Sequence, residues 1–206
     1  MLTSKLEAKG FLKEEKIKSA FQKIDRKDFV SEKSKNKAYM DIPLPIGEGQ
    51  TISQPSVVAF MIEWLDPQPG NKILDIGSGS GWTTALLAEI VGKKGKIFGL
   101  ERFSELKEYG KENVAKYNFL DKGQAEIIVG DGYQGLPKQA PFDRILVSAS
   151  LSGEKQIPTS WNKQLKDSGI VVTPIKNSIY KLTKQKEEFK KESQSGFRFV
   201  PLVKDE

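Results

Sequence analysis

The stretch KILDIGSGSGWTTALLAEIVG (residues 72–92) decides the fold of this chain. Its first part, residues 72–77, is a short apolar run that predicts a buried strand, and residues 82–92 have the pattern of a helix. Between them stand three glycines at alternate positions, Gly77, Gly79 and Gly81. Such a turn serves as an ordinary strand–helix connection or brings backbone close to a ligand, and the acidic residues described below favour the second interpretation.

Strands and helices continue to alternate on both sides of this stretch. Apolar runs predict strands at 96–102, 125–131, 144–150 and 169–175, and helical patterns lie at 13–25, 55–65, 104–117 and 157–165. Strands that alternate with helices need crossover connections, so we expect an α/β fold, a mostly parallel sheet with helices on both faces. Segments 178–185 and 196–203 alternate with period 2, which predicts antiparallel strands at the C-terminal edge, and the charged stretch 184–192 is interpreted as edge protection and a solvated turn.

Length and composition narrow the possible chemistry. The 206 residues suit one domain (1–206), in which we expect residues 1–54 to form a helical and lid segment packed on a core of residues 55–206. Cysteine and histidine are both absent, so thiolate ligands, disulfides and imidazole bases are excluded, and we predict no metal site. The net charge of +6 is spread along the chain, which favours solubility over nucleic-acid binding. No signal sequence or apolar span of ~20 residues is present, so we expect a cytoplasmic protein without membrane contact.

Acidic residues stand at the ends of three successive predicted strands. Asp75, just before the first glycine, would repel a pyrophosphate but suits a ligand with an ammonium and a sulfonium, as in S-adenosylmethionine. Glu101 can accept hydrogen bonds from both ribose hydroxyls, and Asp131 from an adenine amine. Open α/β sheets bind ligands at this edge, so we predict S-adenosylmethionine as cofactor. The predicted cofactor residues are Asp75, Gly77, Ser78, Gly79, Gly81, Glu101, Arg102, Asp131 and Gly132.

Several stretches resemble the protein-L-isoaspartate (D-aspartate) O-methyltransferase family. They are AYMDIPLPIGEGQTISQP (38–55), LDIGSGSGW (74–82), GLER (99–102), GDGYQGLPKQAPFD (130–143), QLKDSGIVVTPI (164–175) and FVPL (199–202), of which GQTISQP (49–55) is the most specific. The resemblance implies a Rossmann-like class I S-adenosylmethionine-dependent methyltransferase fold with a seven-stranded sheet. It also implies methyl transfer to the α-carboxylate of L-isoaspartyl residues in damaged proteins or peptides. The ester then cyclises to a succinimide, which reopens partly to aspartate.

By the same resemblance, Ser53 is the active-site serine and the remaining substrate residues flank it or lie after the fourth predicted parallel strand. These are Thr51, Ile52, Gln54, Ser148, Ala149 and Ser150. The chain departs from the family pattern at Ser56, where an aromatic residue or histidine is common, at 148–158, which is longer and more polar, and at 167–169, where DSG replaces a double glycine. We expect a monomer.

A carboxylate acceptor suits a protein without histidine. Its pKa lies near 4, so it is anionic at pH 7, and attack on a sulfonium methyl group needs positioning rather than proton removal. Ser53, which no histidine can activate, would orient the acceptor rather than act as a nucleophile. We therefore interpret GEGQTISQPS (47–56) as a polar lid, although a solvated loop in which Ser53 caps the helix starting at Pro55 also fits.

Three other functions remain open at this stage. A carboxyl methyltransferase acting on aspartates of a dedicated peptide would usually need an added recognition segment. A nucleic-acid base methyltransferase often carries an Asn/Asp-Pro-Pro-aromatic strip after the fourth strand, where this chain has VSASLSG (147–153). A non-catalytic cofactor-binding module would fit if the changes at Ser56 and 148–153 closed the peptide groove.

Overall fold

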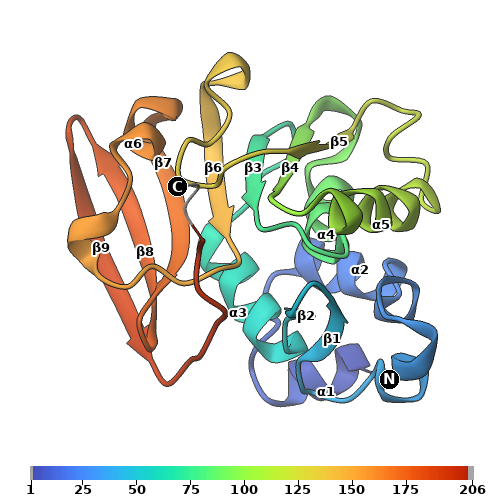
Figure 1. The fold of residues 1–206 in the computed structure, drawn as a ribbon. Helices are drawn as coiled ribbons and strands as arrows, with labels where there is room; N and C mark the ends of the chain where they lie inside the picture. Colours follow the sequence, from blue (N-terminus) through green and yellow to red (C-terminus); the bar gives the residue numbers. More distant parts are fainter. Residues whose placement is uncertain (1, 204–206) are drawn as a thin grey trace.

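The computed structural model describes residues 2–203, which form a seven-stranded mixed sheet with helices around it (Figure 1). The strands lie in the order β5-β4-β3-β6-β7-β8-β9. Their bounds are β3 Lys72–Ile76, β4 Lys96–Glu101, β5 Ala125–Val129, β6 Phe142–Val147, β7 Leu165–Ile175, β8 Ser178–Gln185 and β9 Glu188–Ser195. Strands β3 to β7 pair in parallel, and β8 and β9 are added antiparallel at the edge. The chain runs outward from β3 to β5 and returns to β6, so the topological switch point lies between β3 and β6.

Six α-helices, five short 3-10 helices and a separate hairpin complete the described fold. The α-helices are α1 Leu2–Ala8, α2 Glu15–Lys23, α3 Pro55–Leu65, α4 Trp82–Val91, α5 Ser104–Ala115 and α6 Thr159–Gln164. The hairpin joins β1 Leu44–Gly47 to β2 Gln50–Ile52. None of the helices in residues 2–203 is long and apolar enough to cross a membrane.

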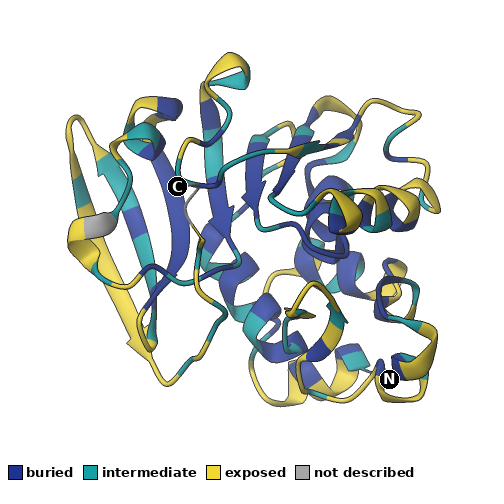
Figure 2. Cartoon of the chain, in the orientation of Figure 1, coloured by how far each residue is buried: buried dark blue, intermediate teal, exposed yellow. Residues whose placement is uncertain are grey.

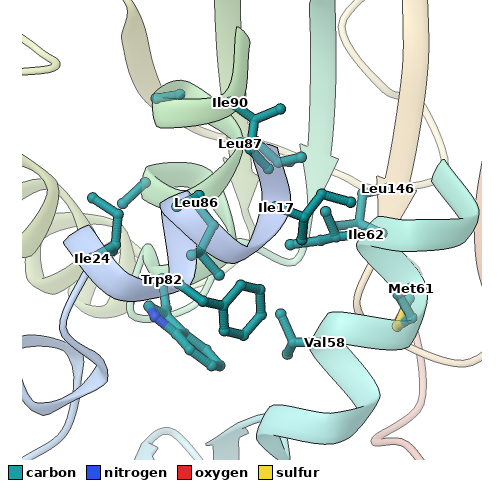
Figure 3. Close-up of a cluster of buried hydrophobic side chains, with 14 of the residues drawn as sticks. Ile17, Ile24, Val58, Met61, Ile62, Trp82, Leu86, Leu87, Ile90 and Leu146 are labelled. Atoms are coloured by element: carbon teal, nitrogen blue, oxygen red, sulfur yellow. The ribbon is translucent and has the colours of Figure 1, made fainter. Parts of the chain in front are cut away.

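The sheet separates two apolar clusters because its side chains alternate between faces. Ile73 and Leu146 join the larger cluster with α2, α3 and α4, whereas the neighbouring Leu74 and Ile145 join the smaller one around Trp161 of α6. Figure 3 shows the larger cluster, where Ile17 and Ile24 pack towards side chains of α3 and α4. The central strands are buried on both faces, as Figure 2 shows, which explains why they form continuous apolar runs.

The strongly periodic segments are where the sequence predicts them. Helix α3 spans residues 55–65 with Pro55 in its first turn, and α4 ends at Gly92. The predicted stripe of the N-terminal helix is buried, with Ile17 and Ala20 fully inaccessible.

The prediction for the C-terminal edge is wrong in one strand. Strand β9 is Glu188–Ser195, which overlaps the stretch 184–192 interpreted as edge protection and a turn, and residues 196–203 contain no strand beyond an isolated bridge at Pro201. Because β9 is the outermost strand, nearly all of its residues are exposed and no apolar alternation marks it (Figure 2). Residues 196–203 instead start beside the end of β7 and continue along the carboxyl ends of the strands to the segment after β6 (Figure 1).

Candidate active site

A cavity opens at the carboxyl ends of β3, β4 and β6, at the switch point of the sheet. Its wall combines the glycine loop, the tip of β4, the segment after β6, the hairpin and the C-terminal segment. The predicted residues that line it are Thr51, Ile52, Ser53, Gly77, Ser78, Gly79, Glu101, Arg102, Gly132, Ser148 and Ala149. The fold therefore brings most of the predicted cofactor and substrate residues to one place.

The Glu101 carboxylate in this wall is held in place by three backbone N–H groups. Its side chain is 6% exposed, and Oε2 accepts a hydrogen bond from the Gly79 N–H at 2.8 Å. Oε1 accepts from the N–H groups of Arg102 at 2.8 Å and Phe103 at 3.1 Å. A carboxylate has about four lone-pair sites, so these backbone bonds fix its position and leave acceptor capacity for a ligand hydroxyl.

Asp75 does not line the cavity, so its predicted contact with the cofactor is not supported by its position. The side chain is completely buried, and Oδ2 accepts hydrogen bonds from the hydroxyls of Thr83 and Thr84, each at 2.7 Å. These threonines belong to the first turn of α4, whose two hydroxyls draw the carboxylate towards the helix. Burial is the largest influence on the Asp75 carboxyl and raises its pKa to about 6.

The raised pKa predicts that Asp75→Asn changes the pH dependence of stability. The folded protein binds the Asp75 proton more tightly than the unfolded chain does. Protonation of Asp75 therefore stabilises the fold fully below about pH 4, and this stabilisation is lost as pH rises through about 6. A shift of about two pKa units corresponds to about 3 kcal/mol. We therefore expect the stability of the Asn variant relative to the wild type to rise by about 2–3 kcal/mol between pH 4 and 7, as measured by urea unfolding. A difference that does not change with pH would contradict the assignment.

Gly81 also lies outside the cavity wall, and close packing of two helices explains it better than cofactor binding does. A Cβ at this position would lie 2.7 Å from Val114 Cγ2 and 2.8 Å from the carbonyl oxygen of Gly110, both in α5. Its φ of +85° is in addition a conformation that side chains disfavour. The glycine thus lets α4 begin directly against α5.

Gly81→Ala is therefore expected to destabilise the fold by about 2–4 kcal/mol, because overpacking and left-handed strain add. Gly10→Ala is the matched control: Gly10 has a φ of +73°, but a Cβ there would meet nothing within 4 Å. We expect this control to lose only about 1 kcal/mol in the same denaturant titration. Equal losses in both variants would show that backbone strain alone matters.

Three further predicted residues lie near the cavity without lining it. Asp131 Oδ1 accepts a hydrogen bond from the Tyr133 N–H at 2.9 Å, which closes a local turn. The two neighbours of Asp131, Gly130 and Gly132, do line the cavity. Gln54 donates through Nε2 to Ser56 Oγ at 2.9 Å. Ser150 exchanges backbone hydrogen bonds with the C-terminal segment. The side chains of Asp131 and Gln54 thus bond within local turns, and the main chain of Ser150 pairs with the C-terminal segment.

The first part of the stretch interpreted as a lid belongs to a tight hairpin. Glu48 and Gly49, at its turn, both have positive φ, as two-residue hairpin turns require. Ser53 follows β2 and lines the cavity, but it does not cap α3. The N-cap residue of α3 is Gln54, whose side chain makes no capping hydrogen bond. Asp41 takes that role instead, since its Oδ1 accepts from the Ser56 N–H at 2.9 Å.

Sequence reasoning missed several apolar residues of the wall. Ile46 of the hairpin would meet a Cβ placed on Gly79 at 3.0 Å, so the hairpin sits directly over the glycine loop. The C-terminal segment contributes Val200, Pro201, Leu202 and Val203. Two backbone bonds hold that segment, from Ser150 N–H to Val200 O and from Leu202 N–H to Ser150 O, each at 2.8 Å. The FVPL stretch was the available signal, but it was interpreted as an edge strand.

The lining residues fit the adenosyl part of S-adenosylmethionine. A fixed carboxylate, Glu101, stands ready for ribose hydroxyls, and apolar side chains such as Leu100 and Leu202 suit a flat base. Small hydroxyl and backbone groups of the glycine loop remain for a polar tail. Sheet order, switch point and this cavity define a class I S-adenosylmethionine-dependent methyltransferase.

Comparisons with known proteins identify the family. The family model described as protein-L-isoaspartate(D-aspartate) O-methyltransferase matches residues 1–206. A relative from Methanopyrus kandleri named protein-L-isoaspartate O-methyltransferase is 39% identical, covering 100% of this chain and 91% of the relative. The chain belongs to the protein-L-isoaspartate(D-aspartate) O-methyltransferase family. It is a methyltransferase that depends on S-adenosylmethionine and acts on isoaspartyl residues of proteins in their repair.

Solved structures agree with this assignment. A Plasmodium falciparum protein assigned as a protein-L-isoaspartate O-methyltransferase, in complex with S-adenosyl-L-homocysteine, has a TM-score of 0.88 at 27% identity over 99% of this chain and 97% of its own. A second solved protein-L-isoaspartate O-methyltransferase has a TM-score of 0.86 at 29% identity. It covers 97% of this chain, which spans 64% of its length.

Proposed function

We propose that the reaction takes place where the hairpin meets the glycine loop, with Ser53 orienting the isoaspartyl α-carboxylate. The observation that supports this most directly is the shared cavity wall, in which Ser53, Glu101 and Ser148 come together from distant parts of the chain. When bound, S-adenosylmethionine supplies a methyl group on a positively charged sulfur. The protein then needs only to hold the acceptor oxygen in line, about 3 Å away.

Each part of the wall has a separate task in this proposal. Glu101, with its carboxylate fixed by three N–H groups, holds the ribose end. Thr51 of the hairpin and Ser53 just after it contact the acceptor, and the small residues Ser148 and Ala149 after β6 provide room for the peptide. Neither carboxylate nor hydroxyl has to lose a proton, so the absence of histidine from the sequence is no obstacle.

We further propose that the enzyme acts as a monomer in the cytoplasm and has no nucleic-acid substrate. A chain without cysteine suits a reducing compartment. Its lysines are distributed over the sequence and partly neutralised by neighbouring carboxylates, as in the pairs Lys166–Asp143 and Lys191–Glu154.

An assay with labelled S-adenosylmethionine tests which of the possible substrates is methylated. The protein is incubated with an isoaspartyl peptide, with the aspartyl peptide of the same sequence, and with RNA. We expect base-labile label on the isoaspartyl peptide alone. Label on RNA, on both peptides equally, or on neither would contradict the proposal.

A further inference from the structure

Arg26 is a buried cation that binds backbone carbonyls instead of carboxylates. It is 1% exposed and lies in the short helical turn Arg26–Phe29 that follows α2. Nη1 donates to Ala38 O at 2.8 Å and to Met40 O at 3.4 Å. Nη2 donates to Ile42 O and to Ser53 O, both at 3.0 Å.

These contacts connect two segments that are far apart in the sequence. A single nitrogen holds the carbonyls of Ile42 and Ser53, so these two backbone groups are immediate neighbours. The guanidinium carbon also lies 5.4 Å from the centroid of the Trp82 ring, and Trp82 itself lines the cavity. Arg26 thus contacts Ser53 and Trp82, which both line the cavity, although Arg26 itself does not line it.

An arginine is well suited to bind several backbone carbonyls at once, and its burial needs a physical explanation. A guanidinium presents five N–H donors in a rigid fork, whereas an ammonium donates from one point and cannot reach four separated carbonyls. Burial opposes the charge and lowers the pKa of Arg26 to about 10, so the group is still charged at neutral pH. Desolvating a cation is costly unless its partners are held in place, which the four carbonyls achieve.

We propose that Arg26 is a positioning residue that fixes the Ser53 backbone, and with it the Ser53 hydroxyl, against the segment 38–42 so that the acceptor carboxylate is aligned. This inference rests on the proposed role of Ser53. It predicts that loss of the fork affects turnover of the peptide much more than binding of the cofactor product.

Arg26→Lys tests this, with Arg144→Lys as the matched control. Arg144 also donates to carbonyls, through Nε to Leu65 O at 2.8 Å and through Nη1 to Asp143 O at 2.9 Å, but it does not line or contact the cavity. For each variant we measure kcat and KM for the isoaspartyl peptide, the Kd of S-adenosylhomocysteine, and hydrogen exchange of residues 38–54. If Arg26→Lys does not fold, Arg26→Gln is used, which keeps a two-donor nitrogen.

The expected result for the Arg26 variant is a tenfold or larger fall in kcat/KM, a Kd for S-adenosylhomocysteine within twofold of wild type, and faster exchange in residues 50–54. Arg144→Lys is expected to keep kcat/KM within twofold. Equal losses of turnover and cofactor affinity, or unchanged exchange of residues 50–54, would overturn the proposal. The exchange measurement holds even if the wild type fails to methylate the peptide, a result that would contradict the proposed function instead.

Discussion

Glu101→Gln is expected to weaken binding of S-adenosylhomocysteine about a hundredfold or more. The amide keeps the size of the side chain, but it has one acceptor oxygen where the carboxylate has two. In the wild type, Oε1 and Oε2 accept backbone N–H groups from opposite sides, so a Gln must turn its NH₂ towards one of them. Hydrogen bonds to a charged acceptor contribute about 1.5–3 kcal/mol each, and 1.4 kcal/mol is a factor of ten in affinity.

Calorimetric titration measures the effect, with Glu105→Gln as the control. Glu105 is exposed at the start of α5, four residues along, and its carboxylate accepts from the Ser104 hydroxyl. We expect the Glu105→Gln variant to bind S-adenosylhomocysteine with the affinity of the wild type. A Kd for Glu101→Gln within threefold of the wild type would show that this carboxylate serves the loop and not the ligand.

Ser53→Ala should lower kcat on the isoaspartyl peptide about tenfold to a hundredfold, with little change in cofactor affinity. Ser53 lines the cavity, and a hydroxyl that donates to a carboxylate contributes about 1.5–3 kcal/mol. The Arg26 bond is made to the main-chain oxygen of Ser53 and survives the substitution, so the hairpin keeps its place.

Steady-state rates and the Kd of S-adenosylhomocysteine are measured together for Ser53→Ala. Ser195→Ala, at the exposed end of β9, is the control and should behave as wild type. Equal losses of turnover and affinity would mean that Ser53 supports the cofactor. No loss in either would remove it from the active site.

The parts of the fold that the sequence predicts are those with strong local patterns. Helix α3 begins at a proline and continues apolar, and strand β3 is a short apolar run bounded by turn residues, so local patterns are enough to locate both. The position of Glu101 follows from the same logic, because a residue that ends a parallel strand must reach the edge where ligands bind.

The features that the sequence did not reveal depend on contacts between distant residues. Strand β9 carries no apolar alternation, because its neighbour β8 is its only pairing partner and solvent covers the rest. The sequence does not show that Asp75 Oδ2 accepts hydrogen bonds from two threonines of α4. Asp41 caps α3 from 15 residues away, a pairing that no local capping signal encodes.

The construction of the cavity wall has a consequence for how the enzyme matures. The wall needs the hairpin, early in the chain, and residues 200–203, which are synthesised long after it. A polypeptide that lacks residues 200–203 therefore presents an incomplete cofactor pocket, even when its central strands have already paired. By mass action the methyl donor stabilises the chain in which both parts of the wall are in place, so ligand-induced heat resistance reports on the assembly of this wall.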